Sequence, residues 1–294
     1  MNLALARALL ATAASGAGVD PGAAELIRLG ENAVFRLPGA VVARVSREGQ
    51  VPAARHEVEV ARWLEEQGVP AVRVAPGHED VVEVSGHAVS FWAELPPHRP
   101  ADFPQIAGAL RRLHALTSTG AGLRLRPLEP LVRVEERLLG SALLSDEELT
   151  FLLARLDDLR ERFVALPPGL PSSPVHGDAW SGNVVATDTG EVVLLDLERF
   201  SQGPPEWDLV STAVRFTSYG TMTRRQYEGF RRAYGGYDVL EWAGFETLRD
   251  VRELRVVTYA LQLAAEDPSL AEQARLRVKC LRAGDRPWPG WRAL

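Results

Sequence analysis

The most informative stretch of the chain is PVHGDAWSGNVVATDTGEVVLLDLE, residues 174–198. Asp178 follows His176 by two residues and precedes Asn183 by five, in a loop made largely of small residues. A short apolar run further along the chain then ends at a second aspartate, Asp196. A His, an Asp and an Asn at this spacing, followed by an Asp that ends a predicted strand, seldom occur together by chance.

This pattern supplies the groups that phosphoryl transfer needs. The carboxylate of Asp178 can take the proton of an attacking hydroxyl. The side-chain oxygens of Asn183 and Asp196 are hard ligands, suited to a Mg²⁺ ion that bridges nucleotide phosphates. The stretch therefore predicts a phosphotransferase that uses Mg²⁺ and ATP, with GTP left open. A zinc hydrolase using His176 and Asp178 as ligands is disfavoured, because no second His cluster stands at zinc spacing.

The composition fits such an enzyme and excludes some other classes. A chain of 294 residues has room for two domains with sizeable cores, and 46% apolar and 24% charged residues are typical of a globular protein. The net charge of −6 argues against a nucleic-acid partner. No apolar run is long enough to cross a bilayer, so we expect no membrane association. The composition makes no prediction of the oligomeric state.

Cysteine and lysine usage narrows the chemistry further. The single Cys280 excludes an intramolecular disulfide and predicts a cytoplasmic, reducing location. Arg7 interrupts the apolar N-terminus, which also lacks a basic leader, so we expect a helix there and not a signal peptide. Lys279 is the only lysine, which excludes a P-loop. Any cationic side chain that binds phosphates in the first half of the chain must therefore be an arginine.

Short apolar runs separated by Gly and Pro predict a five-stranded antiparallel sheet in the first third of the chain. The expected strands cover residues 32–37, 40–47, 69–74, 81–84 and 87–95. One helix, residues 53–67, is inserted and ends before Gly68. Residues 1–14 and 21–29 are interpreted as helical or loosely ordered.

Beyond Pro96 and Pro97 the pattern becomes helical, and the hairpin after Asn183 is the only predicted β structure. The expected helices cover residues 104–116, 146–166, 207–217, 223–234, 245–265 and 270–282. We therefore predict an α+β, protein-kinase-like fold with two lobes. Residues 1–95 form a small nucleotide-binding lobe, and residues 96–294 form a larger, mainly helical lobe for catalysis and substrate binding.

The chain resembles the superfamily of aminoglycoside phosphotransferases and choline kinases, small-molecule kinases with a protein-kinase-like fold. The motifs HGDAWSGN (176–183), LLDLERF (194–200) and GPPEWDLV (203–210) carry the resemblance. LRRLHAL (110–116) and GVPAVRV (68–74) are weaker support. The resemblance runs from about residue 30 to the C-terminal helices. It does not fix the substrate, because the acceptor pocket of the family lies in variable helices.

The resemblance implies roles for the residues of the main motifs. Asp178 corresponds to the catalytic base, and Asn183 and Asp196 correspond to the two metal ligands. His176 scaffolds the loop, and Asp208 matches a buried aspartate that supports the loop by hydrogen bonds. A buried carboxylate is costly unless it is satisfied in this way.

In the small lobe, the resemblance implies that Arg44 binds phosphates and that Glu57 pairs with it, with Glu59 as a competing partner. A guanidinium suits a diphosphate because it donates two parallel hydrogen bonds. Gly30 and Asn32 lie in a turn whose backbone amides either cover the phosphates or form an ordinary turn.

Two further positions follow from the same resemblance. Ala93, Glu94 and Leu95 occupy the hinge, where backbone groups would bind the adenine edge. Glu198 follows Asp196 where some relatives place a second acid. It either steers a second Mg²⁺ ion, contacts the substrate or forms a surface salt bridge.

The acceptor is the least determined part of the prediction. By resemblance, an aminoglycoside or amino-sugar antibiotic is the preferred acceptor, with Asp250 and Glu253 as candidate contacts, and antibiotic resistance as the consequence. A choline-like, homoserine-like or sugar metabolite is the alternative. A pseudokinase that binds nucleotide without turnover is the alternative from another class. Arginines interleaved with these acids indicate that part of this charge is solvated surface.

Overall fold

The computed structural model describes residues 1–17, 20–116, 123–288 and 290–291, and it divides into two compact units. The first unit comprises residues 1–101, 116–125 and 181–200, and the second comprises residues 102–115, 126–180 and 201–294. The predicted lobe boundary at residue 95 lies near the end of the first segment. The structure differs in that the hairpin and Asp196 belong to the first unit.

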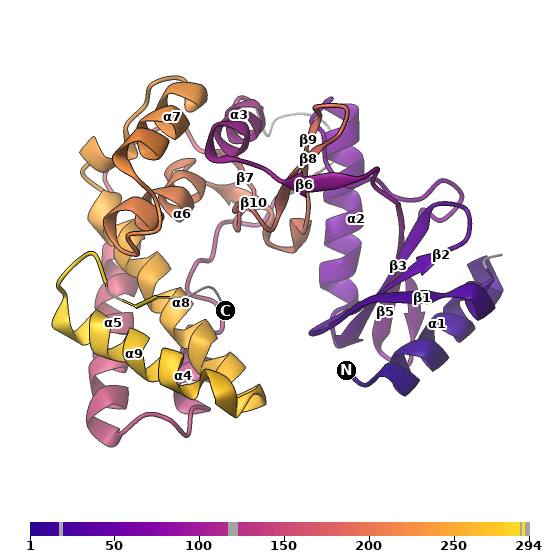
Figure 1. The fold of residues 1–294 in the computed structure, drawn as a ribbon, viewed down its shortest axis with the longest axis horizontal. Coiled ribbons are helices and arrows are strands. Elements are labelled where there is room, and N and C mark those ends of the chain that lie inside the picture. The colour runs from indigo at the N-terminus through magenta and orange to yellow at the C-terminus, as the bar shows by residue number, and fades with distance from the viewer. Residues whose placement is uncertain (18–19, 117–122, 289, 292–294) are drawn as a thin grey trace. The chain divides into compact units, whose positions relative to one another are not determined.

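The first unit is built on a five-stranded antiparallel sheet with the strand order β1-β2-β3-β5-β4 (Figure 1). The strands are β1 (Glu25–Leu29), β2 (Ala33–Leu37), β3 (Val41–Glu48), β4 (Val82–Val84) and β5 (His87–Ala93). The strand count is as predicted, but two of the predicted assignments are wrong. Residues 25–29 form a strand, and residues 69–74 form only isolated bridges, Ala71 with Leu194 and Val74 with Trp92.

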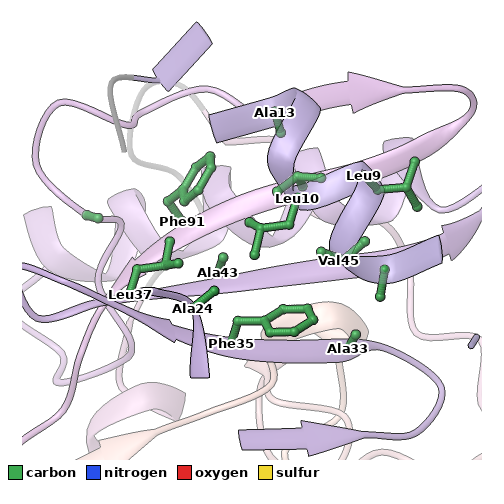
Figure 2. Packing of buried hydrophobic residues seen from close by; sticks show 13 residues of the cluster. Leu9, Leu10, Ala13, Ala24, Ala33, Phe35, Leu37, Ala43, Val45 and Phe91 are labelled. Atoms are coloured by element: carbon green, nitrogen blue, oxygen red, sulfur yellow. The ribbon is translucent and has the colours of Figure 1, made fainter. Parts of the chain in front are cut away.

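Side-chain alternation along these strands decides where the core and the site lie. Phe35 of β2, Ala43 and Val45 of β3 and Phe91 of β5 all point to one face, because every second residue of a strand shares a side. Helix α1 (Leu3–Ala17) packs on this face, and Figure 2 shows its Leu9 and Leu10 against the sheet residues. Arg44 lies between Ala43 and Val45, so its side chain points to the opposite face.

Helix α2 (Val51–Glu66) meets the sheet on the face that Arg44 occupies, since Glu57 of α2 binds this arginine. A second, three-stranded sheet completes the unit, with β8 (Val184–Thr187) between β6 (His98–Pro100) and β9 (Val192–Leu194). β8 and β9 are the predicted hairpin, and β6 was not predicted. The short 3₁₀ turns of this unit are Pro21–Ala23 and Leu197–Arg199.

The second unit is mainly helical, as predicted. Its helices are α3 (Phe103–His114), α4 (Val134–Leu139), α5 (Asp146–Val164), α6 (Glu206–Thr217), α7 (Arg224–Tyr234), α8 (Phe245–Glu266) and α9 (Ala271–Ala283). Strands β7 (Ser173–Val175) and β10 (Ser201–Gly203) pair in an antiparallel ribbon that was not predicted. 3₁₀ turns lie at Val239–Glu241 and Pro268–Leu270.

Three of these helices begin where the sequence places a capping box. Asp102, Ser145 and Thr223 each accept a hydrogen bond from the backbone N–H three residues on, and the Gln or Glu at that position bonds back. Such caps satisfy backbone donors that have no partner within the helix. They explain why the predicted starts of α3, α5 and α7 lie within one residue of the observed starts.

Helix α8 has 22 residues, the most of any helix in the described part of the chain. It nevertheless carries charged side chains along its length. No helix among residues 1–17, 20–116, 123–288 and 290–291 has both the length and the apolarity to span a membrane.

We predict that Phe35→Ala lowers the free energy of unfolding of the first unit by about 3–5 kcal/mol, because it opens a cavity against α1. Phe35 is fully buried in the cluster of Figure 2. Ile27→Ala on exposed β1 is the control and should change stability by less than about 0.5 kcal/mol. Urea denaturation measures both variants, and equal losses would contradict the assigned core.

Candidate active site

The loop that carries Asp178 is held by one buried carboxylate. Asp208, in the first turn of α6, accepts hydrogen bonds from the backbone N–H of His176 at 2.7 Å and of Gly177 at 2.9 Å. Trp207 adds a third bond, from its indole N–H to the carbonyl oxygen of Gly177 at 2.9 Å. The backbone just before Asp178 is therefore fixed from both its N–H and its C=O groups. This is the support that the sequence predicts for Asp208.

A histidine completes the surroundings of Asp208. His114, at the end of α3, contacts Asp208 through Nε2 at 3.1 Å and the hydroxyl of Tyr234 through Nδ1 at 2.9 Å. Burial alone would raise the pKa of Asp208, but the hydrogen bond from His114, its charge and the backbone amide of His176 together lower it. Asp208 is therefore held as a carboxylate inside the second unit.

His176 is buried and has a scaffolding position, since its Nδ1 faces the backbone N–H of Asp178 at 3.3 Å. The side chain of Asp178 remains 39% exposed and is therefore accessible to a ligand. Arg252 of α8 reaches it through Nη1, 3.1 Å from Oδ1. The Arg252 guanidinium also lies 4.4 Å from the centre of the Trp207 ring, and it contacts the Ser211 hydroxyl.

In the first unit, the predicted phosphate-binding arginine forms a buried ion pair. Nη1 of Arg44 lies 2.7 Å from both carboxylate oxygens of Glu57. Glu57 also accepts the backbone N–H of Leu197 at 3.3 Å. Glu59 lies on the exposed side of α2, so Glu57 is the partner and Glu59 is not.

Electrostatics around this pair are unbalanced. Burial acts to lower the pKa of Arg44, but the charges of Glu57, Asp196 and Glu198 outweigh it and raise the pKa. Burial raises the pKa of Glu57, Asp196 and Glu198 raise it further, and Arg44 opposes them. The guanidinium thus faces three carboxyl groups, an excess of negative charge that a divalent cation would offset.

An open pocket of about 310 Å³ lies beside Arg44, lined by residues of β3, β5, α2 and the turn before β2. Asn32 lines it, and its amide oxygen faces Arg44 at 3.0 Å from Nε and 2.8 Å from Nη2 in the orientation that satisfies both residues. Gly30 donates its N–H to the carbonyl oxygen of Asn32 at 3.1 Å, which closes the predicted turn. Glu198 lies in the same pocket, with Oε2 3.5 Å from Nη2 of Arg44.

Asn183 and Asp196 lie at the ends of the β8–β9 hairpin. The carbonyl oxygen of Asn183 accepts the N–H of Leu195 at 2.8 Å, so the hairpin pairing brings the two ends together. Asp196 is exposed and has a left-handed backbone, with φ of 54°. A non-glycine residue in this conformation costs about 1–3 kcal/mol and is most often found at functional sites.

The donor set fits Mg²⁺. An amide oxygen and a carboxylate are hard ligands, and Mg²⁺ usually takes one or two protein carboxylates and completes its shell with phosphates and water. Within the described residues, no cluster of three or more His, Cys, Asp or Glu side chains is arranged to hold a metal. The residues present therefore suit a metal that arrives with a nucleotide.

The predicted hinge residues follow β5. Ala93 donates its N–H to Arg73 at 2.8 Å, and Glu94 donates its N–H to Ala40 at 2.8 Å. The Glu94 carboxylate binds Arg36 at 2.6 Å. Among the described residues, the N–H of Leu95 makes no such backbone bond. Leu95 is therefore the hinge position best able to donate to an adenine edge.

The two acids proposed as acceptor contacts lie within α8 and are neutralised by arginines. Glu253 is fully buried and accepts two bonds from Arg286, at 2.7 and 2.5 Å. Asp250 lies within 3.4 Å of four arginines, namely Arg155, Arg162, Arg249 and Arg286. Both carboxylates therefore have structural partners, and their role toward a substrate stays a prediction.

Sequence reasoning assigned no role to His114 or Arg252. His114 was part of LRRLHAL, which served only as motif support. The signal that could have identified it is a lone His in the last turn of an amphipathic helix, where a buried partner is expected. Arg252 was interpreted as part of a partly solvated charged stretch. Arg252 and Arg255 are in fact buried, with 6% and 8% of their surfaces exposed.

Fold and sequence together define an α+β phosphotransferase with a kinase-like fold. The sequence matches the phosphotransferase enzyme family over residues 26–249, and the chain belongs to this family. A sequence search of curated proteins finds no significant match.

Solved structures with the same fold include kinases of different acceptors. A choline/ethanolamine kinase family protein from Mesorhizobium loti is 24% identical, with a TM-score of 0.62 over 96% of this chain and 95% of its own. Aminoglycoside phosphotransferase APH(3'')-Id from Streptomyces rimosus is 21% identical, with a TM-score of 0.60 over 86% and 98%, and a second structure of it contains ADP and streptomycin. Choline kinase LicA from Streptococcus pneumoniae is 15% identical, with a TM-score of 0.66 over 95% and 99%.

We predict that Asp208→Asn lowers the free energy of unfolding by about 3 kcal/mol at pH 7, because the amide cannot accept as the buried carboxylate does. The pKa of Asp208 is lowered in the folded state, so its stabilisation is complete above the ordinary Asp value of about 3.9 and is lost as the pH falls through the lowered pKa. Urea denaturation at several pH values should show the gap between wild type and variant closing below about pH 4. A gap that stays constant down to pH 3 would refute this role.

Proposed function

We propose that the protein transfers the γ-phosphoryl group of ATP, with Mg²⁺, to a hydroxyl group of a small molecule. The observation that carries this proposal is the fixed loop in which Asp208 holds the backbone of His176 and Gly177 directly before the accessible Asp178. A catalytic base needs such positioning, because phosphoryl transfer gains most from orientation and electrostatics.

In the proposed reaction, Asp178 accepts the proton of the acceptor hydroxyl. The acceptor oxygen bonds to the γ-phosphorus, the bond from that phosphorus to the β–γ bridging oxygen breaks, and ADP leaves. Arg252 orients Asp178 through its bond to Oδ1. Asn183 and Asp196 would hold Mg²⁺, which neutralises phosphate charge when it is bound.

Arg44 is the proposed phosphate-binding side chain. Its pair with Glu57 fixes the guanidinium, and the adjoining pocket offers space on its open side. The Leu95 N–H would bind the adenine edge, and the ADP complex of the Streptomyces rimosus protein supports a nucleotide here. ATP is preferred over GTP only as the commoner donor. A need for ATP and the buried free Cys280 favour a cytoplasmic location.

An aminoglycoside acceptor, with antibiotic resistance as its consequence, stays a candidate by likeness to the Streptomyces rimosus protein and its streptomycin complex. The alternatives are a choline-like metabolite, by likeness to the two choline kinase relatives, and homoserine-like or sugar metabolites. The presence of Asp178, Asn183 and Asp196 supports turnover over a pseudokinase role. ADP release screened over aminoglycosides, amino alcohols, sugars and hydroxy acids separates these cases, and a pseudokinase would give no acceptor-dependent ADP.

Replacement of the base tests the chemistry. Asp178→Asn should lower kcat at least about 100-fold, the usual scale for a general base, and leave ATP affinity unchanged. Asp188→Asn is the matched control, since Asp188 is an exposed carboxylate in the β8–β9 turn, and it should keep wild-type turnover. The assignment of Asp178 fails if its Asn variant turns over the same acceptor at a wild-type rate.

Nucleotide binding tests the first unit. Isothermal titration should show that Asp196→Ala removes the increase in ATP affinity that Mg²⁺ gives the wild type. Arg44→Ala and Arg44→Lys should both weaken ATP binding, the latter about tenfold, because a lysine cannot donate two parallel bonds. Arg55→Ala, on the exposed side of α2, should bind as wild type does. Unchanged ATP affinity in both Arg44 variants would exclude the proposed phosphate contact.

A further inference from the structure

A second group of polar side chains lies in the second unit, next to Asp178, and the proposed phosphoryl transfer uses only one of its members. We call it the donor cluster. It consists of Arg215 and the nearby Tyr219 at the end of α6, Arg252 of α8, and Trp288 and Trp291 of the C-terminal segment.

Ring contacts join the three aromatic residues of the cluster. Tyr219 stacks on Trp291 with 4.3 Å between ring centroids, and Trp288 lies 5.0 Å from Trp291 and 6.2 Å from Tyr219. The backbone N–H of Trp288 donates to the carbonyl oxygen of Ser218 at 2.7 Å, which fastens Trp288 to the end of α6.

The cluster contains buried hydrogen-bond donors that have no acceptor among the residues that the structure describes. These atoms are Nε of Arg215, Nε of Arg252, Nε1 of Trp288, Nε1 of Trp291 and the hydroxyl of Tyr219. Arg252 and Trp288 expose only 6% and 2% of their surfaces. A folded protein leaves few buried polar groups unsatisfied, and each costs about 1–3 kcal/mol. Four N–H groups and one hydroxyl that the described residues leave without an acceptor therefore indicate a missing acceptor group.

The charges in the cluster select the kind of acceptor. Burial raises the pKa of Tyr219, and Glu253 raises it further, whereas Arg252, Arg277 and Arg215 act to lower it. Three guanidinium groups and one carboxylate therefore act electrostatically on this hydroxyl. Glu253 is already held by two bonds from Arg286, and Arg215 has no carboxylate within 4.0 Å among the described residues. An uncompensated positive charge with donor-only groups is complementary to an oxyanion.

Arg252 links the cluster to the base. Its Nη1 binds Asp178, and its Nε is one of the cluster donors, so both contacts belong to one guanidinium. The cluster also reaches the surface, since Arg215, Tyr219 and Trp291 are only partly buried. A small molecule with a hydroxyl group at Asp178 can therefore place a second group among these donors.

We propose that the donor cluster binds an oxyanion group of the acceptor, a carboxylate or a phosphate, so that the substrate is an anionic hydroxyl compound and not a polyamine. The inference that the acceptor is an anionic compound rests on the proposed phosphotransferase function. The inference that the donor cluster binds an anion does not depend on that function. The ion pairs of Asp250 and Glu253 with arginines also favour an anionic acceptor, because they leave little free negative charge near α8 for a cationic one.

Indole N–H resonances in ¹H–¹⁵N NMR spectra test the site directly, with inorganic sulfate as the probe and sodium chloride at equal ionic strength as the reference. The chain has seven tryptophans, and Trp288→Phe and Trp291→Phe assign the two that matter. Sulfate should shift both resonances in a saturable manner. Arg215→Gln should weaken this response about tenfold or more, as the loss of a charge-assisted bond implies. The control variant Arg275→Gln replaces an exposed arginine of α9 and should respond to sulfate as the wild type does.

The proposal is overturned if the two indole resonances respond equally to sulfate and to chloride. It is also overturned if they respond to sulfate as strongly in Arg215→Gln as in the wild type. Trp288→Phe, which keeps an aromatic ring but removes the indole N–H, provides a second test and should weaken sulfate binding reported by Trp291. An ADP-release assay with glycerate, glycerol and ethanolamine at equal concentration separates the two proposals. Sulfate binding without turnover of any compound contradicts the kinase function alone. Turnover of ethanolamine with silent indoles contradicts the anion site alone.

Discussion

The buried carboxylate of Asp208 is the interaction on which the candidate active site depends. It satisfies two consecutive backbone N–H groups of the loop, and it is satisfied in turn by His114, which Tyr234 orients. A carboxylate without these partners could not stay charged inside the second unit. The same bonds determine the direction in which Asp178 leaves the loop, so protein stability and catalytic geometry have one origin.

The ion pair of Arg44 and Glu57 is the corresponding constraint in the first unit. Strand alternation turns Arg44 away from the apolar face that α1 covers and toward α2. In a chain with a single, distant lysine, arginine is the cation left for this position. It keeps its charge at every physiological pH, so the proposed attraction of Arg44 for phosphates depends on geometry and neighbouring acids, not on protonation.

Much of the fold could be predicted because local signals agreed with it. Helical periodicity predicted the helices, and Gly and Pro turns predicted the boundaries of β2, β3 and β5. Residues 25–29 were missed because that edge strand has no buried residue and hence no alternation to detect. The roles of Arg252 and Glu253 could not be predicted, because charges buried on all sides of α8 depend on partners from distant segments. The roles of Asp178, Asn183 and Asp196 were predicted from motif spacing and from the family resemblance, and they stay predictions.

The central claim is that a phosphoryl group passes from ATP to a small-molecule hydroxyl. ³¹P NMR of the protein with Mg·ATP and a mixture of hydroxyl compounds tests it most directly, since each phosphorus species has its own resonance. We expect a new phosphomonoester signal that grows at the rate at which ADP appears and that requires an acceptor. Formation of ADP and inorganic phosphate alone, at a rate independent of every acceptor, would contradict it.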